Sequence, residues 1–66
     1  MNGKITVIKG VVVEVKFEKD FPRVYDALVV EQKNSNGDEV VIEVLQLLED
    51  GVVRGIAMDS TDGIKR

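Results

Sequence analysis

The segment VVVEVKFE, residues 11–18, constrains the fold more than any other part of the chain, because its side chains alternate. Every second residue from Val11 to Phe17 is apolar, and the intervening positions that follow Val12 are charged. A period of two is typical of a strand with one face on a core, since successive side chains of a β-strand point to opposite faces. The segment therefore predicts a half-buried strand. The residues predicted to point inward are Val11, Val13, Val15 and Phe17.

Further segments rich in valine and isoleucine follow, separated by turn signals roughly every ten residues. Gly10 predicts a bulge or a sharp bend between KITVIK and the alternating segment. Residues 18–26 form a predicted connection, and Asn36-Gly37 suits the positive backbone angles of a type I′ hairpin turn. Short strands at this spacing predict an all-β domain. This spacing fits either a barrel or a sandwich.

Residues 40–48, VVIEVLQLL, fit either a helix or a strand by composition, because leucine and glutamate also favour helices. A strand is favoured because Val40, Ile42 and Val44 alternate and because a hairpin signal precedes them. The sequence EDG at 49–51 predicts a tight turn, after which VVRGIAM is predicted to form another strand.

The chain of 66 residues contains neither cysteine nor histidine. Disulfides and thiolate metal sites are therefore excluded, and the commonest general base and metal ligand is missing. A chain this short usually needs a disulfide, a metal or a partner to be stable, so oligomerisation is the route that is left. We expect the chain to bind no cofactor and no metal.

The charge of the chain argues against a nucleic-acid partner, because phosphate binding depends on Lys and Arg. Nine basic residues stand against twelve acidic ones, a net charge of −3. The aromatic residues Phe17, Phe21 and Tyr25 are not interleaved with basic residues, as a stacking platform for bases requires. No apolar run approaches the roughly 20 residues of a membrane helix, and no signal peptide is visible. We expect a soluble, intracellular protein without direct membrane contact.

The segment DSTDG, residues 59–63, admits two interpretations because it gathers two carboxylates and two hydroxyls. Asp59 and Asp62 could hold a metal ion or transfer protons. Their spacing does not match that of calcium loops, however, and Asp, Ser and Thr before Gly favour a turn. The chain also lacks the G-x-x-x-x-G-K-[ST] motif of phosphate-binding loops. We favour the turn, with no catalytic residue, and expect that the chain is not an enzyme.

Some positions that are predicted to face outward nevertheless carry valine, namely Val12, Val29 and Val41. Either the strands pack on both faces, or this surface meets another chain. Arg23 and Arg54, each close to apolar residues, also leave two roles open. They could cover the end of the barrel or pair with Asp26 or Asp59, or they could contact a neighbouring subunit.

A more specific pattern lies in FPRVYDALVVE, residues 21–31, and DGVVRGIAMDSTDGIKR, residues 50–66. Together with the first two strands, these segments resemble the N-terminal β-barrel domain of the catalytic beta subunit of F-type rotary ATP synthases. The matching positions of the first block are Gly3, Ile5, Gly10, Val12, Val13, Val15 and Phe17. Those of the second block are Pro22, Val24, Tyr25, Asp26, Ala27 and Leu28. Those of the third block are Glu43, Val44, Asp50, Val53, Arg54, Ile56, Ala57, Met58, Ser60, Thr61, Asp62, Gly63 and Arg66.

The resemblance implies that residues 1–66 form a single small barrel of five to six strands, closed or nearly closed and Greek-key-like. It also implies a structural role rather than a catalytic one. In the family, barrels from alternating alpha and beta subunits form a crown that holds together the hexamer in the peripheral catalytic head of the ATP synthase. The sequence departs from the family pattern at Glu14, at the LLE of residues 47–49 and at Gly55. Such departures suggest a redesigned, consensus-like or ancestral version of the isolated domain, or an unusual natural beta subunit.

In the family the chain continues after this segment and adds a further strand to the barrel, whereas this sequence stops at Arg66. The resemblance therefore implies an unpaired strand edge, which is a template for pairing with another chain. We expect a homo-oligomer, and specifically a twofold dimer, the commonest symmetry. The predicted interface residues are Val12, Val29, Val41 and Val52. The alternative is a small ligand- or nucleic-acid-binding barrel that reuses the same scaffold.

Overall fold

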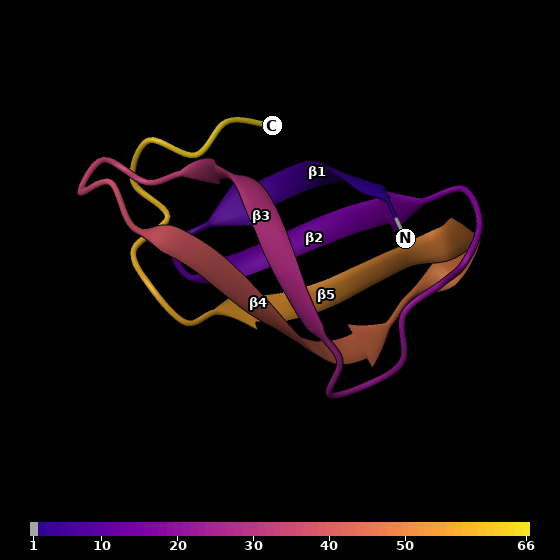
Figure 1. Ribbon diagram of the computed structural model, residues 1–66. Coiled ribbons are helices and arrows are strands. Elements are labelled where there is room, and N and C mark those ends of the chain that lie inside the picture. The colour runs from indigo at the N-terminus through magenta and orange to yellow at the C-terminus, as the bar shows by residue number, and fades with distance from the viewer. Residues whose placement is uncertain (1) are drawn as a thin grey trace.

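The computed structural model describes residues 2–66, which form a five-stranded sheet and one short 3₁₀ turn (Figure 1). The elements are β1 (Gly3–Lys9), β2 (Val12–Phe17), β3 (Ala27–Lys33), β4 (Glu39–Leu47), η1 (Glu49–Gly51) and β5 (Val52–Ala57). Neighbouring strands are antiparallel, in the order β1-β2-β5-β4-β3. The prediction of an all-β domain is confirmed.

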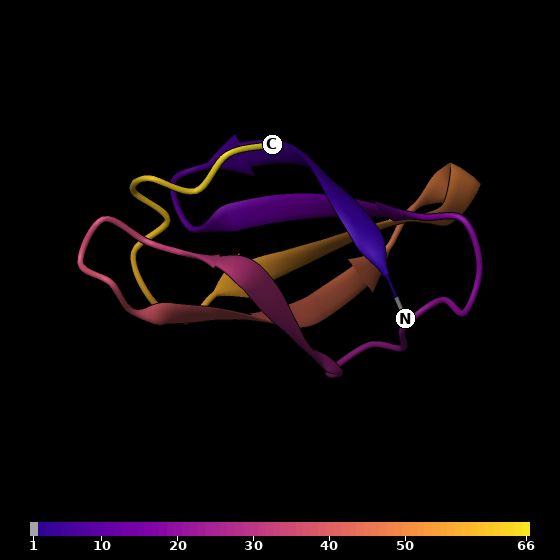
Figure 2. The same ribbon diagram turned by 45° about the horizontal axis from the view of Figure 1, so that its top comes forward.

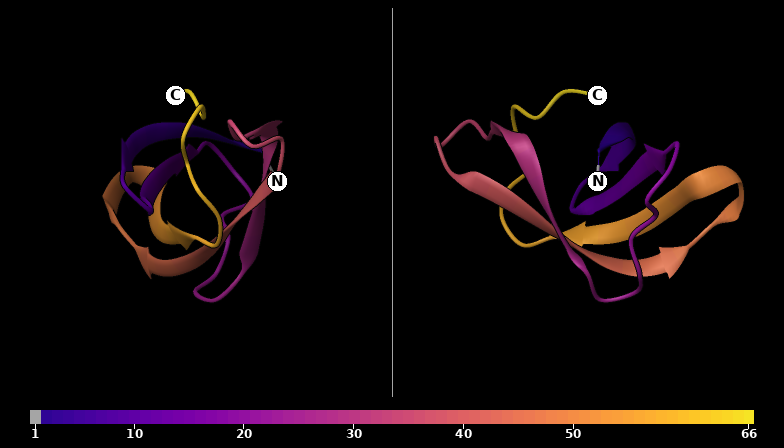
Figure 3. Two further views of the ribbon diagram at one scale, coloured as in Figure 1. Left: turned by 90° about the vertical axis from the view of Figure 1, so that its left-hand side faces the viewer. Right: turned by 45° about the vertical axis from the view of Figure 1, so that its right-hand side comes forward.

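The sheet curls so strongly that its two edge strands, β1 and β3, approach each other across an open side (Figure 3). Strand β5 inserts between β2 and β4, so the connection from β2 to β3 passes from one half of the sheet to the other. This strongly curled arrangement is that of a small barrel, and it confirms the fold that the family resemblance implies.

The core fills the concave side of the sheet. Its fully buried side chains come from β2, β4 and β5, and they are Val13, Val15, Phe17, Val40, Ile42, Val44, Val53 and Ala57. The inward positions predicted for Val13, Val15 and Phe17 are confirmed. The prediction for Val11 is wrong, because Val11 lies in the turn before β2 and is 50% exposed.

The turn between β1 and β2 consists of Gly10 and Val11, and it confirms the sharp bend predicted at Gly10. Lys9 and Val12 pair directly across it. Gly10 has a φ of 61°, in the region that glycine adopts without steric cost. A positive φ at the first of two central residues is the geometry of a type II′ turn.

The hairpin between β3 and β4 forms where the sequence predicts it, but the predicted type I′ turn is wrong. That turn requires positive φ at both central residues. Gly37 has a φ of 81°, whereas Asn36 is not among the residues with positive φ. The buried side chain of Asn34 shapes the loop instead, because its Oδ1 accepts hydrogen bonds from the N–H groups of Asn36 (3.0 Å) and Asp38 (2.9 Å).

Residues 39–47 form β4, so the strand favoured for this segment is confirmed. The register of β4 against β5 shifts between Val44 and Gln46, which marks a bulge there. The predicted tight turn at 49–51 is the 3₁₀ turn η1, in which Asp50 has a φ of 60°.

Residues 18–26 connect β2 to β3, as predicted, and dock on β4. The N–H of Tyr25 donates to the carbonyl of Val44 (2.6 Å), and the N–H of Val44 donates to the carbonyl of Asp26 (2.9 Å). The Asp26 carboxylate accepts from the N–H of Arg23 (2.8 Å). Tyr25 has a φ of 75° and its side chain is exposed.

The C-terminal segment, residues 58–66, runs back over the open side of the barrel (Figure 2). The hydroxyl of Thr61 donates to the carbonyl of Gly10 (2.7 Å), and the N–H of Ser35 donates to the carbonyl of Asp62 (2.7 Å). Asn34 adds a third link by donating to the carbonyl of Ser60 (3.0 Å). Residues 59–63 are therefore a turn that is hydrogen-bonded to both the β1–β2 hairpin and the β3–β4 hairpin.

Candidate association face

Side chains on the convex side of the sheet lie in rows that cross the strands, because paired residues of neighbouring strands stand opposite one another. One row, called here the central row, takes one residue from each strand in sheet order: Lys9, Val12, Ile56, Glu43 and Ala27. Val12 and Ile56 are half-buried at its centre. A positive and a negative side chain, Lys9 and Glu43, flank this apolar pair.

The next row toward the β1 N-terminus, called here the ion-pair row, contains Val7, Glu14, Arg54 and Gln46. Arg54 donates from Nε (3.1 Å) and Nη2 (2.9 Å) to Oε2 of Glu14, and from Nη1 (3.3 Å) to Oε1 of Gln46. Of the roles left open for Arg54, pairing with a carboxylate of the same chain is the one observed, but the partner is Glu14 instead of Asp26 or Asp59. The charges of this row therefore satisfy one another within the chain.

On the other side of the central row, Val29 and Val41 are direct partners across β3 and β4. Met58 adjoins them, because its N–H donates to the carbonyl of Val41 (2.8 Å). Val29 is 60% exposed and Met58 is 54% exposed. Together with the centre of the central row they form a group of apolar residues on neighbouring strands, called here the association face: Val12, Val29, Val41, Ile56 and Met58.

Three of the four predicted interface residues thus lie together, and the fourth does not. Val52 is opposite Lys16, two rows away from the central row along β5. Val52 instead lines a separate apolar hollow of about 280 Å³ at the end of the barrel, together with Phe21 and Leu47.

Ile56 and Met58 are members of the face that reasoning from the sequence missed. The signal that could have found Ile56 is the alternation of VVRGIAM, in which Val53, Gly55 and Ala57 are buried and Ile56 points the other way. Met58 follows the last residue of β5, and its position depends on the contact with Val41. No local sequence pattern predicts this position.

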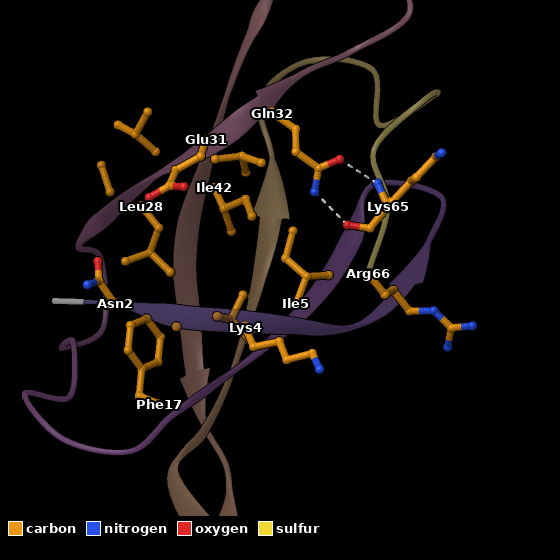
Figure 4. Close-up of a pocket in the computed structure, with 15 residues that line it drawn as sticks. Asn2, Lys4, Ile5, Phe17, Leu28, Glu31, Gln32, Ile42, Lys65 and Arg66 are labelled. Carbon is orange, nitrogen blue, oxygen red and sulfur yellow. Dashed lines mark hydrogen bonds between the residues drawn. The ribbon is translucent and has the colours of Figure 1, made fainter.

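A groove of about 520 Å³ lies on the open side, between the edge strands β1 and β3 (Figure 4). Apolar residues such as Ile5 and Leu28 form its floor, and Lys4, Lys65 and Arg66 lie at its rim. The side chain of Gln32 spans part of it by donating from Nε2 to the Lys65 carbonyl (2.6 Å) and accepting from the Lys65 N–H (2.8 Å). Gln32 thus pairs with the main chain of Lys65 as a neighbouring strand would.

The acidic residues of DSTDG do not gather into a site. Within residues 2–66, no group of three or more acidic side chains could hold a metal ion. The N–H of Asp62 is instead bonded to the Ser60 hydroxyl (3.2 Å), a bond typical of turns. Over the same residues, no helix has the length and the apolar character needed to cross a membrane.

A comparison with protein families places the chain. The model of the ATP synthase alpha/beta family, beta-barrel domain, matches residues 5–66, which is nearly the whole chain. The match includes all of β2 to β5 and most of β1, and therefore every residue of the association face.

Proposed function

The chain belongs to the ATP synthase alpha/beta family, as its beta-barrel domain, and from that premise we propose that it is a non-catalytic assembly domain. Its activity in this proposal is association through the outside of the barrel. The sequence blocks that resemble the beta subunit favour beta over alpha as its counterpart in the family. Its partners in the family context are then the alpha and beta subunits of the peripheral catalytic head.

The observation that carries the proposal is the apolar association face on the convex side of the sheet. An antiparallel sheet needs only one apolar face to form a core. Its other face is commonly polar and solvated when it binds no partner. Here two directly paired cross-strand positions are apolar on both strands, Val12 with Ile56 and Val29 with Val41. Apolar surface of this kind, bordered by charges, marks interaction sites on small proteins.

For the chain on its own, the proposed form is a homodimer in which the centre of each association face, Val12 and Ile56, covers that of a second copy. A domain of this size buries only about 60% of its unfolded surface, so covering further apolar area stabilises it appreciably. Dimers with twofold symmetry are the commonest way in which identical chains bury such a surface.

The test is the mass of the protein in solution, measured by light scattering as the concentration rises to high micromolar. The wild-type mass is expected to approach that of a dimer. Ile56→Thr is expected to remain monomeric, because it places a hydroxyl at the centre of the face while keeping a β-branched side chain. Val52→Thr is the matched control on the same strand, outside the face, and should dimerise normally. A wild-type monomer at every concentration would sink the proposal.

A second candidate function, ligand or nucleic-acid binding, is favoured by the groove with Lys4, Lys65 and Arg66 at its rim. The aromatic residues do not support base stacking there, since Phe17 is buried and Phe21 lies in the hollow beside Val52. The same samples with an added oligonucleotide distinguish the two candidates. A salt-dependent rise in mass upon this addition would favour the second one.

A further inference from the structure

The distribution of charge on the convex side fixes how two copies would meet, an inference that rests on the proposed function. Across the central row the order is positive, apolar, apolar, negative, from Lys9 through Val12 and Ile56 to Glu43. Within residues 2–66, neither Lys9 nor Glu43 has an ion-pair partner. The two charges are three strands apart, about 14 Å at the usual strand spacing.

Two sheets that face each other can be related by a twofold axis along the strands or by one across them. An axis across the strands returns each strand to its own counterpart, so if it passes through the central row Lys9 faces Lys9 and Glu43 faces Glu43. An axis along the strands, between β2 and β5, reverses the order within each row. Lys9 of one copy then faces Glu43 of the other, on both sides of the apolar centre. Because like charges across an interface are unfavourable, the charges select the axis along the strands.

The ion-pair row supports the same choice independently. Glu14 is on β2 and Arg54 is on β5, on opposite sides of the proposed axis. Reversal of this row brings Arg54 of one copy over Glu14 of the other, so the two internal pairs form one alternating group of four charges. An axis across the strands would set Arg54 against Arg54 instead if it passed through this row.

The curl of the sheet limits the area of this contact. Because the sheet is strongly curled, two convex faces touch over a small area and diverge away from it (Figures 1 and 3). Contact is then closest over β2 and β5, where Val12 and Ile56 lie side by side. Lys9 on β1 and Glu43 on β4 stand where the two surfaces begin to diverge, and their long side chains can bridge that gap.

We propose that the chain dimerises through the convex face of β2 and β5, about a twofold axis parallel to these strands. In this dimer Val12 packs on Ile56 of the second copy, and two equivalent ion pairs between Lys9 and Glu43 close the two sides. The charges fix the register, while the apolar centre supplies most of the affinity. The contact is narrow, so the dimer is weaker than one with a standard-size interface.

Charge reversal tests the register, with the dissociation constant measured by sedimentation equilibrium. Lys9→Glu or Glu43→Lys alone replaces both ion pairs by like-charge contacts, and each is expected to weaken the dimer about tenfold. The double variant Lys9→Glu/Glu43→Lys restores both pairs with reversed polarity and is expected to regain wild-type affinity. An equal mixture of the two single variants is also expected to associate, because each supplies the charges that the other lacks.

Lys65→Glu and Glu31→Lys are the matched controls, since they make the same charge changes at the groove on the opposite side of the barrel. They should leave the dissociation constant unchanged. Circular dichroism melting of each variant establishes that it is folded, as expected for substitutions of charges outside the core.

The outcomes separate the register from the association itself. A wild-type dimer that is insensitive to both single reversals, or a double variant as weak as the singles, overturns the register and leaves the assembly proposal standing. Sensitivity to Lys65→Glu or Glu31→Lys instead places the contact at the edges of β1 and β3 and also overturns the register. A wild-type monomer overturns the assembly proposal, and the inferred dimer with it.

Discussion

Val13 and Val12 are neighbours on β2, but they lie on opposite faces of the sheet. Val13 is 2% exposed and packs in the core, whereas Val12 is half-buried on the convex side, beside Ile56. The core faces of β2, β4 and β5 are aliphatic or aromatic, and burial alone accounts for this. The convex face combines apolar residues with charges in ordered rows, an arrangement that folding does not need. We infer that the inner face determines the fold and that the outer face determines which partner the barrel binds.

The largest expected effect comes from the same substitution made on the two faces of β2. Val13→Ala removes part of a fully buried side chain and is expected to lower the free energy of unfolding by roughly 1–3 kcal/mol. Val12→Ala should lower it by less than about 1 kcal/mol for the monomer, since the side chain is already partly hydrated. Urea denaturation at low protein concentration measures both. Equal losses would break the distinction between the faces.

A smaller effect is expected from the ion pair on the convex side. Glu14→Gln removes the charge that Arg54 contacts at 2.9 Å, on side chains that are partly exposed. Pairs of this kind contribute little, so the stability of the monomer should fall by less than about 1 kcal/mol. Glu18→Gln, at an exposed position just after β2, is the control. A loss as large as that of Val13→Ala would mean that the outer face helps to determine the fold.

The sequence predicts the inner face well because its signal is local. Alternation within one strand places Val13, Val15 and Phe17 in the core without knowledge of any other strand. The wrong predictions concern positions where a side chain contacts a segment distant in the sequence, or where a strand ends. Val11 continues the alternation but belongs to a turn, and the turn at 34–37 is shaped by the buried side chain of Asn34, which also reaches Ser60.

The outer face is less predictable because its rows depend on pairing between distant segments. Val12 can be recognised as apolar and outward-facing, but its neighbour Ile56 is known only from the register of β2 with β5. The positions of Lys9 and Glu43 on either side of the apolar centre of the same row require three pairings at once. Family resemblance indicates the barrel and an assembly role, and does not indicate which charges face each other.

The most direct test of the central claim is the melting temperature of the wild-type protein as a function of its concentration. If the outer face associates in the folded state only, dimerisation stabilises that state by mass action, and the melting temperature rises with concentration. The account predicts this rise for the wild type and for Val52→Thr, and its loss in Ile56→Thr. A wild-type melting temperature that is independent of concentration would contradict it.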